Sequence, residues 1–279
     1  MSLAEPQVSY IVDTDNGLGS KSGDVDDGFA LAVMLAAGVP IEAIVPTAGN
    51  VSAEESRLNC RSLVRLARLD DALVCSSSEA ARRYGTVSGQ EKRYIALGPL
   101  TSLAERVSES TFTAGISEVV ILGGDTKSIG FLQPVWPFEF NLTKDRPAFR
   151  EVFNSSLLLT FIPVNVARKM RVSWCQVAAL EGDLGTYIAS GAARWFRRAR
   201  VYQFAKTVPV WDLVAAAYVL WPELCTVVDR NAYIDWSGRI RWSERARRAT
   251  KVVGDIEASE MWRRFAGIVG SFRACESKR

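Results

Sequence analysis

Five aspartates lie close together between positions 13 and 27 of the chain. They are Asp13, Asp15, Asp24, Asp26 and Asp27. Carboxylates this close repel one another unless a cation or strong hydrogen-bond donors neutralise some of them. Because Ca²⁺ and Mg²⁺ prefer oxygen ligands, the cluster predicts a site for a hard metal ion. The alternative is an aspartate-rich loop in which Asp26 only caps a helix.

The chain contains no histidine, and its five cysteines are widely spaced. The absence of an imidazole excludes the serine and cysteine mechanisms that depend on one, and it excludes histidine-ligated zinc sites. The odd number and wide spacing of the cysteines argue against a disulfide framework and predict a reducing, cytoplasmic location. Chemistry in this chain must therefore use carboxylates, amides, hydroxyls, aromatic rings, lysine or a metal ion.

The elements that position these groups are predicted by short apolar runs that alternate with longer amphipathic ones. Strands are expected at 8–12, 41–49, 94–98, 119–124 and 157–164, and helices at 28–38, 52–67, 100–107 and 145–153. Strands separated by helices predict an α/β fold, an open and mainly parallel sheet with helices on both faces. In such sheets ligands bind at the carboxyl ends of the strands, which is where the first aspartates stand.

We expect one domain over residues 1–279, because no linker-like stretch interrupts the pattern. Near the end, the runs 232–236 and 239–242 flank Ser237 and Gly238, which predicts a small C-terminal hairpin. No run of about 18 residues lacks a charge or a breaker, so no membrane partner is expected.

Positive charge gathers in the last third of the chain. Residues 191–279 carry 17 basic and 9 acidic residues, a net charge of 17 − 9 = +8, whereas the whole chain carries +3. Nucleic-acid binding is one explanation, but no recognised motif supports it, so a nucleic-acid partner is not expected. The arginines concerned are interpreted as solvated helix faces: Arg194, Arg197, Arg198 and Arg200, then Arg245, Arg247 and Arg248.

Further motifs follow the aspartates in a fixed order. They are Ala48-Gly49-Asn50, a helix carrying Asn59, GPLTSLA at 98–104, LGGD at 122–125, Glu139-Phe140-Asn141, Asp145, and Trp211-Asp212 before an apolar helix. In this order and spacing the chain resembles the inosine-uridine-preferring nucleoside hydrolase family, from about residue 9 to residue 224. The resemblance implies hydrolysis of the N-glycosidic bond of a ribonucleoside to ribose and a free base.

The resemblance also implies a cofactor and roles for individual residues. It implies a Ca²⁺ ion, with Mg²⁺ the less favoured choice, and a homo-oligomer, either a dimer or a tetramer. The ion would be held by the carboxylates of Asp15, Asp27 and Asp212 and by the backbone carbonyl of Thr101. Asp15 would also accept a proton from the attacking water. The ribose would be bound by Asp26, Asn50, Glu139 and Asn141.

The sequence departs from the family pattern at three places. Ten residues, 16–25, separate Asp15 from the aspartate pair where the family has three; this Gly/Ser-rich spacer could fold outward or bring in Asp24 as a ligand. Gln133 occupies the offset of a family asparagine that faces the ribose, with Trp136 close by. We assign both residues to substrate binding, where the longer amide of Gln133 and the bulky ring of Trp136 could narrow or redirect the sugar pocket.

The third departure is Trp211, which stands where many family members have a histidine that protonates the leaving base. A tryptophan there resembles the purine-preferring branch, in which the base stacks between aromatic rings. Trp211 is therefore assigned to both catalysis and substrate binding, the alternative being a core residue. Trp136 is the first choice for a second stacking ring, before Trp195, Trp236 and Trp242.

These departures leave a second functional hypothesis. The chain could be a weakened or inactive protein that binds a nucleoside or ribose on the same fold. Release of reducing sugar from ribonucleosides, with and without a chelator, separates the two.

Overall fold

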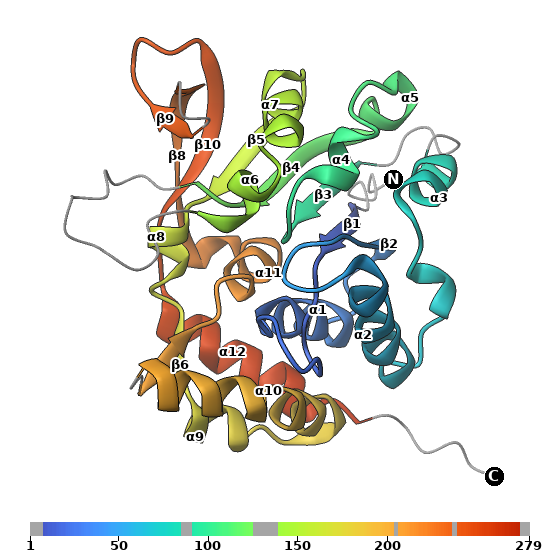
Figure 1. Cartoon of the computed structure of the whole chain (residues 1–279), viewed down its shortest axis with the longest axis vertical. Helices are drawn as coiled ribbons and strands as arrows, with labels where there is room; N and C mark the ends of the chain where they lie inside the picture. The colour runs from blue at the N-terminus through green and yellow to red at the C-terminus, as the bar shows by residue number, and fades with distance from the viewer. Residues whose placement is uncertain (1–7, 85–90, 125–138, 204–205, 236–238, 274–279) are drawn as a thin grey trace, which may run out of the picture.

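Strands from both ends of the chain meet in one main sheet (Figure 1). The computed structural model describes residues 8–84, 91–124, 139–203, 206–235 and 239–273. Within these ranges the main sheet has eight strands, in the order β2-β1-β3-β4-β5-β10-β8-β9. The strands from β2 to β10 are parallel, and β8 and β9 are antiparallel additions. The predicted α/β fold with a mainly parallel sheet is confirmed.

The strands are β1 (Ser9–Thr14), β2 (Ile41–Pro46), β3 (Lys92–Ala96), β4 (Ile116–Leu122), β5 (Leu159–Ile162), β8 (Cys225–Ile234), β9 (Ile240–Trp242) and β10 (Arg248–Ile256). A second, two-stranded sheet pairs β6 (Arg171–Ser173) with β7 (Thr207–Pro209). The helices of the first half are α1 (Asp26–Ala36), α2 (Ala53–Leu66), α3 (Ser77–Tyr84), α4 (Thr101–Ala104) and α5 (Ser110–Thr113). Those of the second half are α6 (Phe140–Lys144), α7 (Arg146–Asn154), α8 (Val164–Ala167), α9 (Trp174–Ala178), α10 (Gly182–Gln203), α11 (Leu213–Leu220) and α12 (Ala258–Ser271). Short 3₁₀ turns lie at Asp71–Leu73 and Pro222–Leu224.

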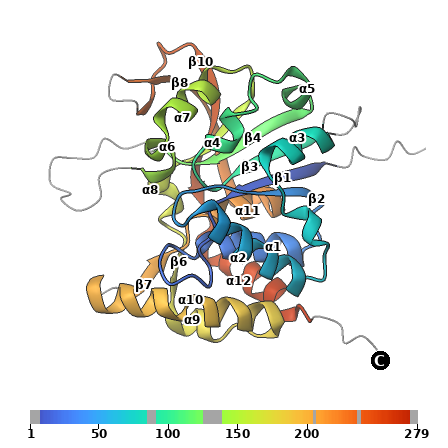
Figure 2. The ribbon, with the colours of Figure 1, turned by 45° about the vertical axis from the view of Figure 1, so that its right-hand side comes forward.

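The two faces of the sheet carry separate cores, because successive residues of a strand point to opposite sides. In β1, Val12 packs into a core shared with α1, α2, α10, α11 and α12. Its neighbour Ile11 packs into the other core, together with residues of α3, α4, α5 and α7. Figure 2 shows α10 and α9 lying outside α1 and α12, so the first face is covered by two helical layers.

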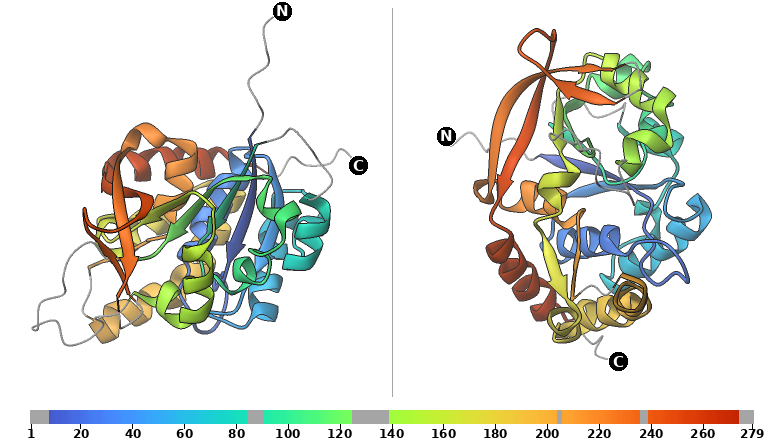
Figure 3. Two further views of the ribbon diagram at one scale, coloured as in Figure 1. Left: turned by 90° about the horizontal axis from the view of Figure 1, so that it is seen from above. Right: turned by 60° about the vertical axis from the view of Figure 1, so that its left-hand side comes forward.

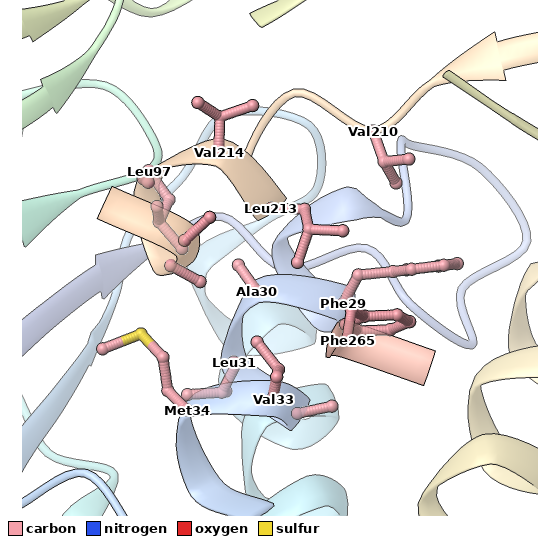
Figure 4. Close-up of a cluster of buried hydrophobic side chains, with 14 of the residues drawn as sticks. Phe29, Ala30, Leu31, Val33, Met34, Leu97, Val210, Leu213, Val214 and Phe265 are labelled. Atoms are coloured by element: carbon pink, nitrogen blue, oxygen red, sulfur yellow. The ribbon is translucent and has the colours of Figure 1, made fainter. Parts of the chain in front are cut away.

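Helix α1 is the centre of the larger core. Residues 26–35 are all buried, which explains why the predicted helix is apolar on every side. Phe29 stacks on Phe265 of α12 with ring centroids 5.6 Å apart. Leu213 and Val214 of α11 lie on the other side of α1 (Figure 4). The amino ends of α1 and α11 are thereby held close together, which matters for the site.

The C-terminal part of the fold differs from its prediction. The hairpin is present as β8 and β9, but β8 also pairs with β10, so the hairpin extends the main sheet. Figure 3 shows β8 and β10 at one edge of the sheet and β1 and β2 at the other. Ser237 and Gly238 lie outside the described residues. Strand β10 itself was not predicted, because its sequence RATKVVGDI mixes charged residues among the apolar ones.

The prediction that both arginine groups lie on exposed helix faces holds for the first group and not for the second. Arg194, Arg197 and Arg198 are exposed on α10, as predicted, while the side chain of Arg200 lies outside the description. The second group is not on a helix, so that interpretation was wrong. Arg245 is in a turn after β9, and Arg247 and Arg248 lead into β10.

In the part of the chain that the structure describes, none of the helices is both long enough and apolar enough to cross a membrane.

Candidate active site

Three carboxylates meet where the amino ends of α1 and α11 approach each other. Asp26, Asp27 and Asp212 each offer an oxygen, and these atoms lie within 4.8 Å of one another. None of the three residues is more than 3% exposed. Asp26 and Asp27 form the first turn of α1, and Asp212 directly precedes α11. Both helices therefore direct the positive ends of their dipoles toward the carboxylates, which favours negative charge there.

Asp15 joins this group from the end of β1. Its backbone N–H donates a hydrogen bond to Oδ1 of Asp27 at 3.2 Å. Its own Oδ2 accepts a hydrogen bond from the backbone N–H of Asn50 at 2.6 Å. Thr14 donates its hydroxyl to the same Oδ1 of Asp27. Thr14 was not predicted to take part, although it stands between the two aspartates of the motif.

Four aspartates each keep one buried oxygen without a hydrogen-bond partner among the described residues. These atoms are Oδ1 of Asp13, Oδ1 of Asp15, Oδ2 of Asp27 and Oδ1 of Asp212, and the last three belong to the group that Asp15 joins. A buried carboxylate oxygen without a donor is costly, because it has lost its water and gained nothing in exchange. A hard cation supplies the missing contact, so this donor set fits Ca²⁺ or Mg²⁺.

The pKa values of the clustered carboxyls also indicate a site for a cation. Burial, followed by the charge of Asp27, raises the pKa of Asp15 well above its usual value. Burial and then the charges of Asp26 and Asp27 do the same to the pKa of Asp212. The pKa of Asp26 is also well raised, first by burial and then by Asp24 and Asp27. These carboxyls cannot all be ionised together unless a cation neutralises them.

Asp26 does not cap helix α1. The residue at the cap position is Val25, which makes no side-chain cap hydrogen bond. Oδ2 of Asp26 instead accepts hydrogen bonds from the backbone N–H groups of Trp211 at 3.1 Å and Asp212 at 3.4 Å. The capping alternative was therefore wrong, and Asp26 joins the start of α1 to the start of α11.

The other two aspartates of the sequence cluster are engaged elsewhere. Oδ2 of Asp13 accepts a hydrogen bond from the hydroxyl of Tyr94 at 2.6 Å, and burial raises the pKa of Asp13 to about 8 in spite of that bond. Oδ1 of Asp24 accepts a hydrogen bond from the indole N–H of Trp195 at 2.7 Å. Asp24 is thus bound to α10, and it is not one of the three aspartates whose oxygens lie within 4.8 Å of one another.

The ten-residue spacer folds back onto the protein, so the predicted outward fold is wrong, and Asp24 as a metal ligand stays an untested alternative. Leu18 is fully buried, and it contacts both Gly28 of α1 and Gly191 of α10 so closely that a Cβ at either position would collide with it. Asn59 of α2 donates its amide to the carbonyl of Asn16 at 2.8 Å and to the hydroxyl of Ser20 at 2.9 Å. The spacer is therefore held by three helices beside the cluster.

Two motif glycines make room for the carboxylate of Asp15. A Cβ on Gly49 would lie 1.9 Å from Oδ2 of Asp15, and one on Gly98 would lie 3.1 Å from its Oδ1. Real Cβ atoms do not approach this closely, so a side chain at Gly49 would displace the carboxylate. The glycines of the Ala-Gly-Asn and Gly-Pro-Leu motifs thus position a site residue, which sequence reasoning had not assigned to them.

The Glu-Phe-Asn motif lies at the ends of β3 and β4. The carboxylate of Glu139 accepts hydrogen bonds from the N–H of Leu142 at 2.8 and 3.0 Å, at the start of α6. Burial nevertheless raises the pKa of Glu139 to about 8. The amide of Asn141 donates to the carbonyls of Leu97 and Leu122 at 2.6 and 3.1 Å. Asn141 therefore ties two strand ends together, and its contact with ribose stays a prediction.

Four other assignments are not tested by the structure. Thr101 begins α4, and its carbonyl accepts a hydrogen bond from the N–H of Glu105 at 3.1 Å. Its hydroxyl donates to Asp145 at 2.7 Å, so the metal-ligand role of the carbonyl stays a prediction. The side chain of Asn50 is half-buried, and its ribose contact also stays a prediction. Gln133 and Trp136 lie outside the described residues.

Trp211 borders the cluster and is half-buried against the larger core. Its indole N–H is buried without a partner among the described residues. Of the other candidate rings, Trp195 is bound to Asp24, and Trp242 packs against Gly124 and edge-on to Phe161 at 6.2 Å. Trp236 lies outside the described residues.

The family model described as inosine-uridine preferring nucleoside hydrolase matches residues 76–263. The chain belongs to this family. The match includes Asp212 and the Glu-Phe-Asn motif and thus covers one side of the carboxylate cluster.

Curated relatives share part of their length with the chain. Uridine nucleosidase 1 of Arabidopsis thaliana is 26% identical over 206 residues, which are 58% of this chain and 58% of the relative. The pyrimidine-specific ribonucleoside hydrolase RihA of Enterobacter sp. is 26% identical over 172 residues, 60% of this chain and 54% of the relative. The chain therefore spans little more than half the length of these relatives.

Solved structures show that the whole fold is shared. A plant nucleoside hydrolase, the PpNRh1 enzyme, superposes with a TM-score of 0.77 at 17% identity, over 96% of this chain and 100% of that chain. A purine-preferring ribonucleoside hydrolase from Gardnerella vaginalis gives 0.73 at 18% identity, over 94% and 98%.

Proposed function

We propose that the chain hydrolyses the N-glycosidic bond of ribonucleosides, with a Ca²⁺ ion held by the buried aspartates. The observation that carries this proposal is the set of unpartnered oxygens on Asp15, Asp27 and Asp212. Ca²⁺ takes about 6–8 oxygen ligands, and a buried group of carboxylates with free oxygens is the kind of site it prefers. The membership of the family supports the same activity.

The ligand set that we propose comprises three carboxylates and one carbonyl. Asp15, Asp27 and Asp212 would each contribute the oxygen that has no other partner, and Thr101 would contribute its backbone carbonyl. Asp26 is held differently, since two backbone N–H groups fix its Oδ2. We assign Asp26, with Asn50, Glu139 and Asn141, to the ribose.

Asp15 is the proposed general base. The N–H of Asn50 and the two close glycines hold its carboxylate in one orientation, which a proton acceptor needs. A bound Ca²⁺ would supply a lowered pKa for the attacking water and an anchor for ribose hydroxyls. Burial raises the pKa of Glu139 to about 8, which favours its protonated form, and in that form the carboxyl can donate as well as accept a hydrogen bond. Carboxylates beside the sugar then stabilise positive charge that develops at its anomeric carbon.

For the nucleobase of the substrate we propose a preference for purines, and the argument for this preference rests on Trp211. The chain has no histidine to protonate a leaving base. Trp211 is joined through its backbone N–H to Asp26, so the residue stands next to the proposed ribose site. Stacking on that ring would let a purine accept its proton from solvent. Among the relatives and structural neighbours, one is named pyrimidine-specific and another purine-preferring, so their names do not decide the preference. The proposed preference for purines therefore rests on Trp211.

The test measures release of reducing sugar from inosine, guanosine, uridine and cytidine, in excess chelator and after Ca²⁺ is restored. We expect turnover only with the ion, and faster turnover of the purine nucleosides. The alternative function, a binding protein without catalysis, would give heat of nucleoside binding in a calorimeter but no sugar. Turnover that survives the chelator would contradict the proposed role of the aspartates.

A further inference from the structure

A shallow, open cavity far from the aspartates is lined by arginines. It has a volume of about 550 Å³ and lies between α7 and the strands β8 and β10. Its basic residues are Arg150, Arg247 and Arg248. In the sheet, β8 is five strand positions away from β1. At about 4.8 Å per position, this cavity lies roughly 24 Å from the carboxylate cluster.

The floor of the cavity is apolar and its rim is positively charged. Phe153 and Ala232 are both buried and belong to the core on this face of the sheet. Arg150 lies one helical turn before Phe153 and Asn154 on α7, so one face of this helix supplies three of the lining residues. Arg150 and Arg247 are exposed.

No carboxylate lines this cavity among the described residues. Arg150 and Arg247 form no ion pair with other described residues. Arg248 donates to the carbonyl of Leu157, and its Nε is buried without a partner among the described residues. Three guanidinium groups thus line the same cavity, and two of them are exposed and form no ion pair among the described residues. Guanidinium groups bind phosphate oxygens in pairs through parallel N–H bonds, which makes phosphate a suitable partner.

We propose that this cavity binds a phosphate monoester of the size of a pentose phosphate or a nucleoside monophosphate. The arginines would hold the phosphate, and the organic part would lie over Phe153 and Ala232. The volume supports the ester over free phosphate, because cavities of about 300–1,000 Å³ take small organic molecules. This inference does not depend on the proposed hydrolase activity.

The test is calorimetric titration of the full chain with ribose 5-phosphate, AMP and inorganic phosphate. The double substitution R150Q/R247Q should weaken binding of both esters about tenfold or more, since it removes two charge-assisted donors. The matched control is R194Q/R197Q, which removes the same charge from exposed positions on α10 and should leave binding unchanged. A second control, Asp27→Asn, should also leave it unchanged, because the ligand does not touch the aspartates.

Five results would overturn the proposal. The unmodified chain could bind none of the three probes, or the two double variants could lose affinity equally, which would reflect net charge alone. A loss in Asp27→Asn would place the ligand in the aspartate cluster. Equal affinity for inorganic phosphate and the esters would remove the role of the organic part, and binding of a single-stranded oligonucleotide without the mononucleotide would indicate a nucleic acid.

Discussion

Gly49 and the carboxylate of Asp15 are in such close contact that no side chain could stand between them. A Cβ on Gly49 would lie 1.9 Å from Oδ2 of Asp15 and 2.8 Å from its Cγ. The same Oδ2 is bound by the next backbone N–H along the chain, that of Asn50. The loop after β2 therefore sets the orientation of the carboxylate at the end of β1.

We expect Gly49→Ala to push this carboxylate out of place. An Asp15 moved by about 1 Å should lower kcat/KM roughly 100-fold, since catalytic geometry tolerates little displacement. Ca²⁺ affinity should fall as well, which calorimetry would measure beside the kinetics. The control is Gly267→Ala on α12, where no atom lies within 4 Å of the new Cβ and the helix should gain about 0.5–1 kcal/mol. Full activity in Gly49→Ala would mean that Asp15 is not the base.

The substitution Asp27→Asn tests the cluster directly. We expect it to abolish Ca²⁺ binding and turnover, because the unpartnered Oδ2 loses its charge. The chain should remain folded, since Oδ1 can still accept the hydrogen bonds from Thr14 and Asp15. Without ion the variant should unfold at a higher temperature than the unmodified chain, because one repelling charge is gone. Normal Ca²⁺ affinity would place the ion elsewhere.

The matched control for Asp27→Asn is the same substitution at Asp24, three residues earlier in the chain. Because its carboxylate accepts the indole N–H of Trp195, we expect Asp24→Asn to leave Ca²⁺ affinity unchanged. A second variant, Asp24→Ala, removes the acceptor and should lose about 1–2 kcal/mol in the free energy of unfolding. Trp195→Phe should cost a similar amount, and the two losses should not add in the double variant. If Asp24→Asn weakened Ca²⁺ binding, the spacer would have supplied a ligand after all.

The raised pKa values predict how Ca²⁺ and pH act together on stability. Asp15, Asp26 and Asp212 have higher pKa values in the folded chain than the usual 3.8, so the folded state holds more protons than the unfolded one. Without the ion, the free energy of unfolding must then fall as the pH rises above about 4. Ca²⁺ replaces those protons, so the stabilisation it gives should grow with pH.

Thermal unfolding in chelator and in excess Ca²⁺, at several pH values between about 5 and 8, measures this. The gap between the two melting temperatures should widen steadily with pH. The Asp27→Asn chain should show almost no gap at any pH. A gap that is constant across the range would mean that the cluster holds no protons in the ion-free chain.

The sequence predicted the first five strands because parallel strands buried on both faces are continuous apolar runs. It also predicted Asp27 and Asp212 as members of one cluster, since both follow recognisable motifs, and the structure brings them together. It failed for β10, whose pairing with β5 depends on the tertiary fold more than on its own composition. For the same reason Arg247 and Arg248 were placed on a helix.

The spacer was unpredictable for a different physical reason. Its glycines and serines suggested a loop that leaves the protein, yet it is held in place by hydrogen bonds from Asn59 and by the packing of Leu18. That side chain is buried between two glycines that lie far apart in sequence, Gly28 and Gly191. Likewise, nothing local in the sequence showed that Trp195 would bind Asp24, 171 residues away. Contacts of this range exist only once the helices are assembled.

The last prediction concerns Trp211, whose backbone is bound to Asp26 and whose ring is half-buried beside the cluster. With no histidine in the chain, the leaving base must be activated by stacking, by water or by a carboxyl with a raised pKa. Base–aromatic stacking is worth about 1–3 kcal/mol, so Trp211→Ala should lower kcat/KM for inosine by roughly 10- to 100-fold.

A substrate that needs no proton provides the internal control. p-Nitrophenyl riboside has a good leaving group, so Trp211→Ala should reduce its kcat/KM much less than that of inosine. Trp211→Phe, which keeps a stacking ring, should restore most of the activity on inosine. Steady-state kinetics on both substrates decides the matter. Equal losses on the two would make Trp211 a packing residue of the core around α11, and the reason for a purine preference would be gone.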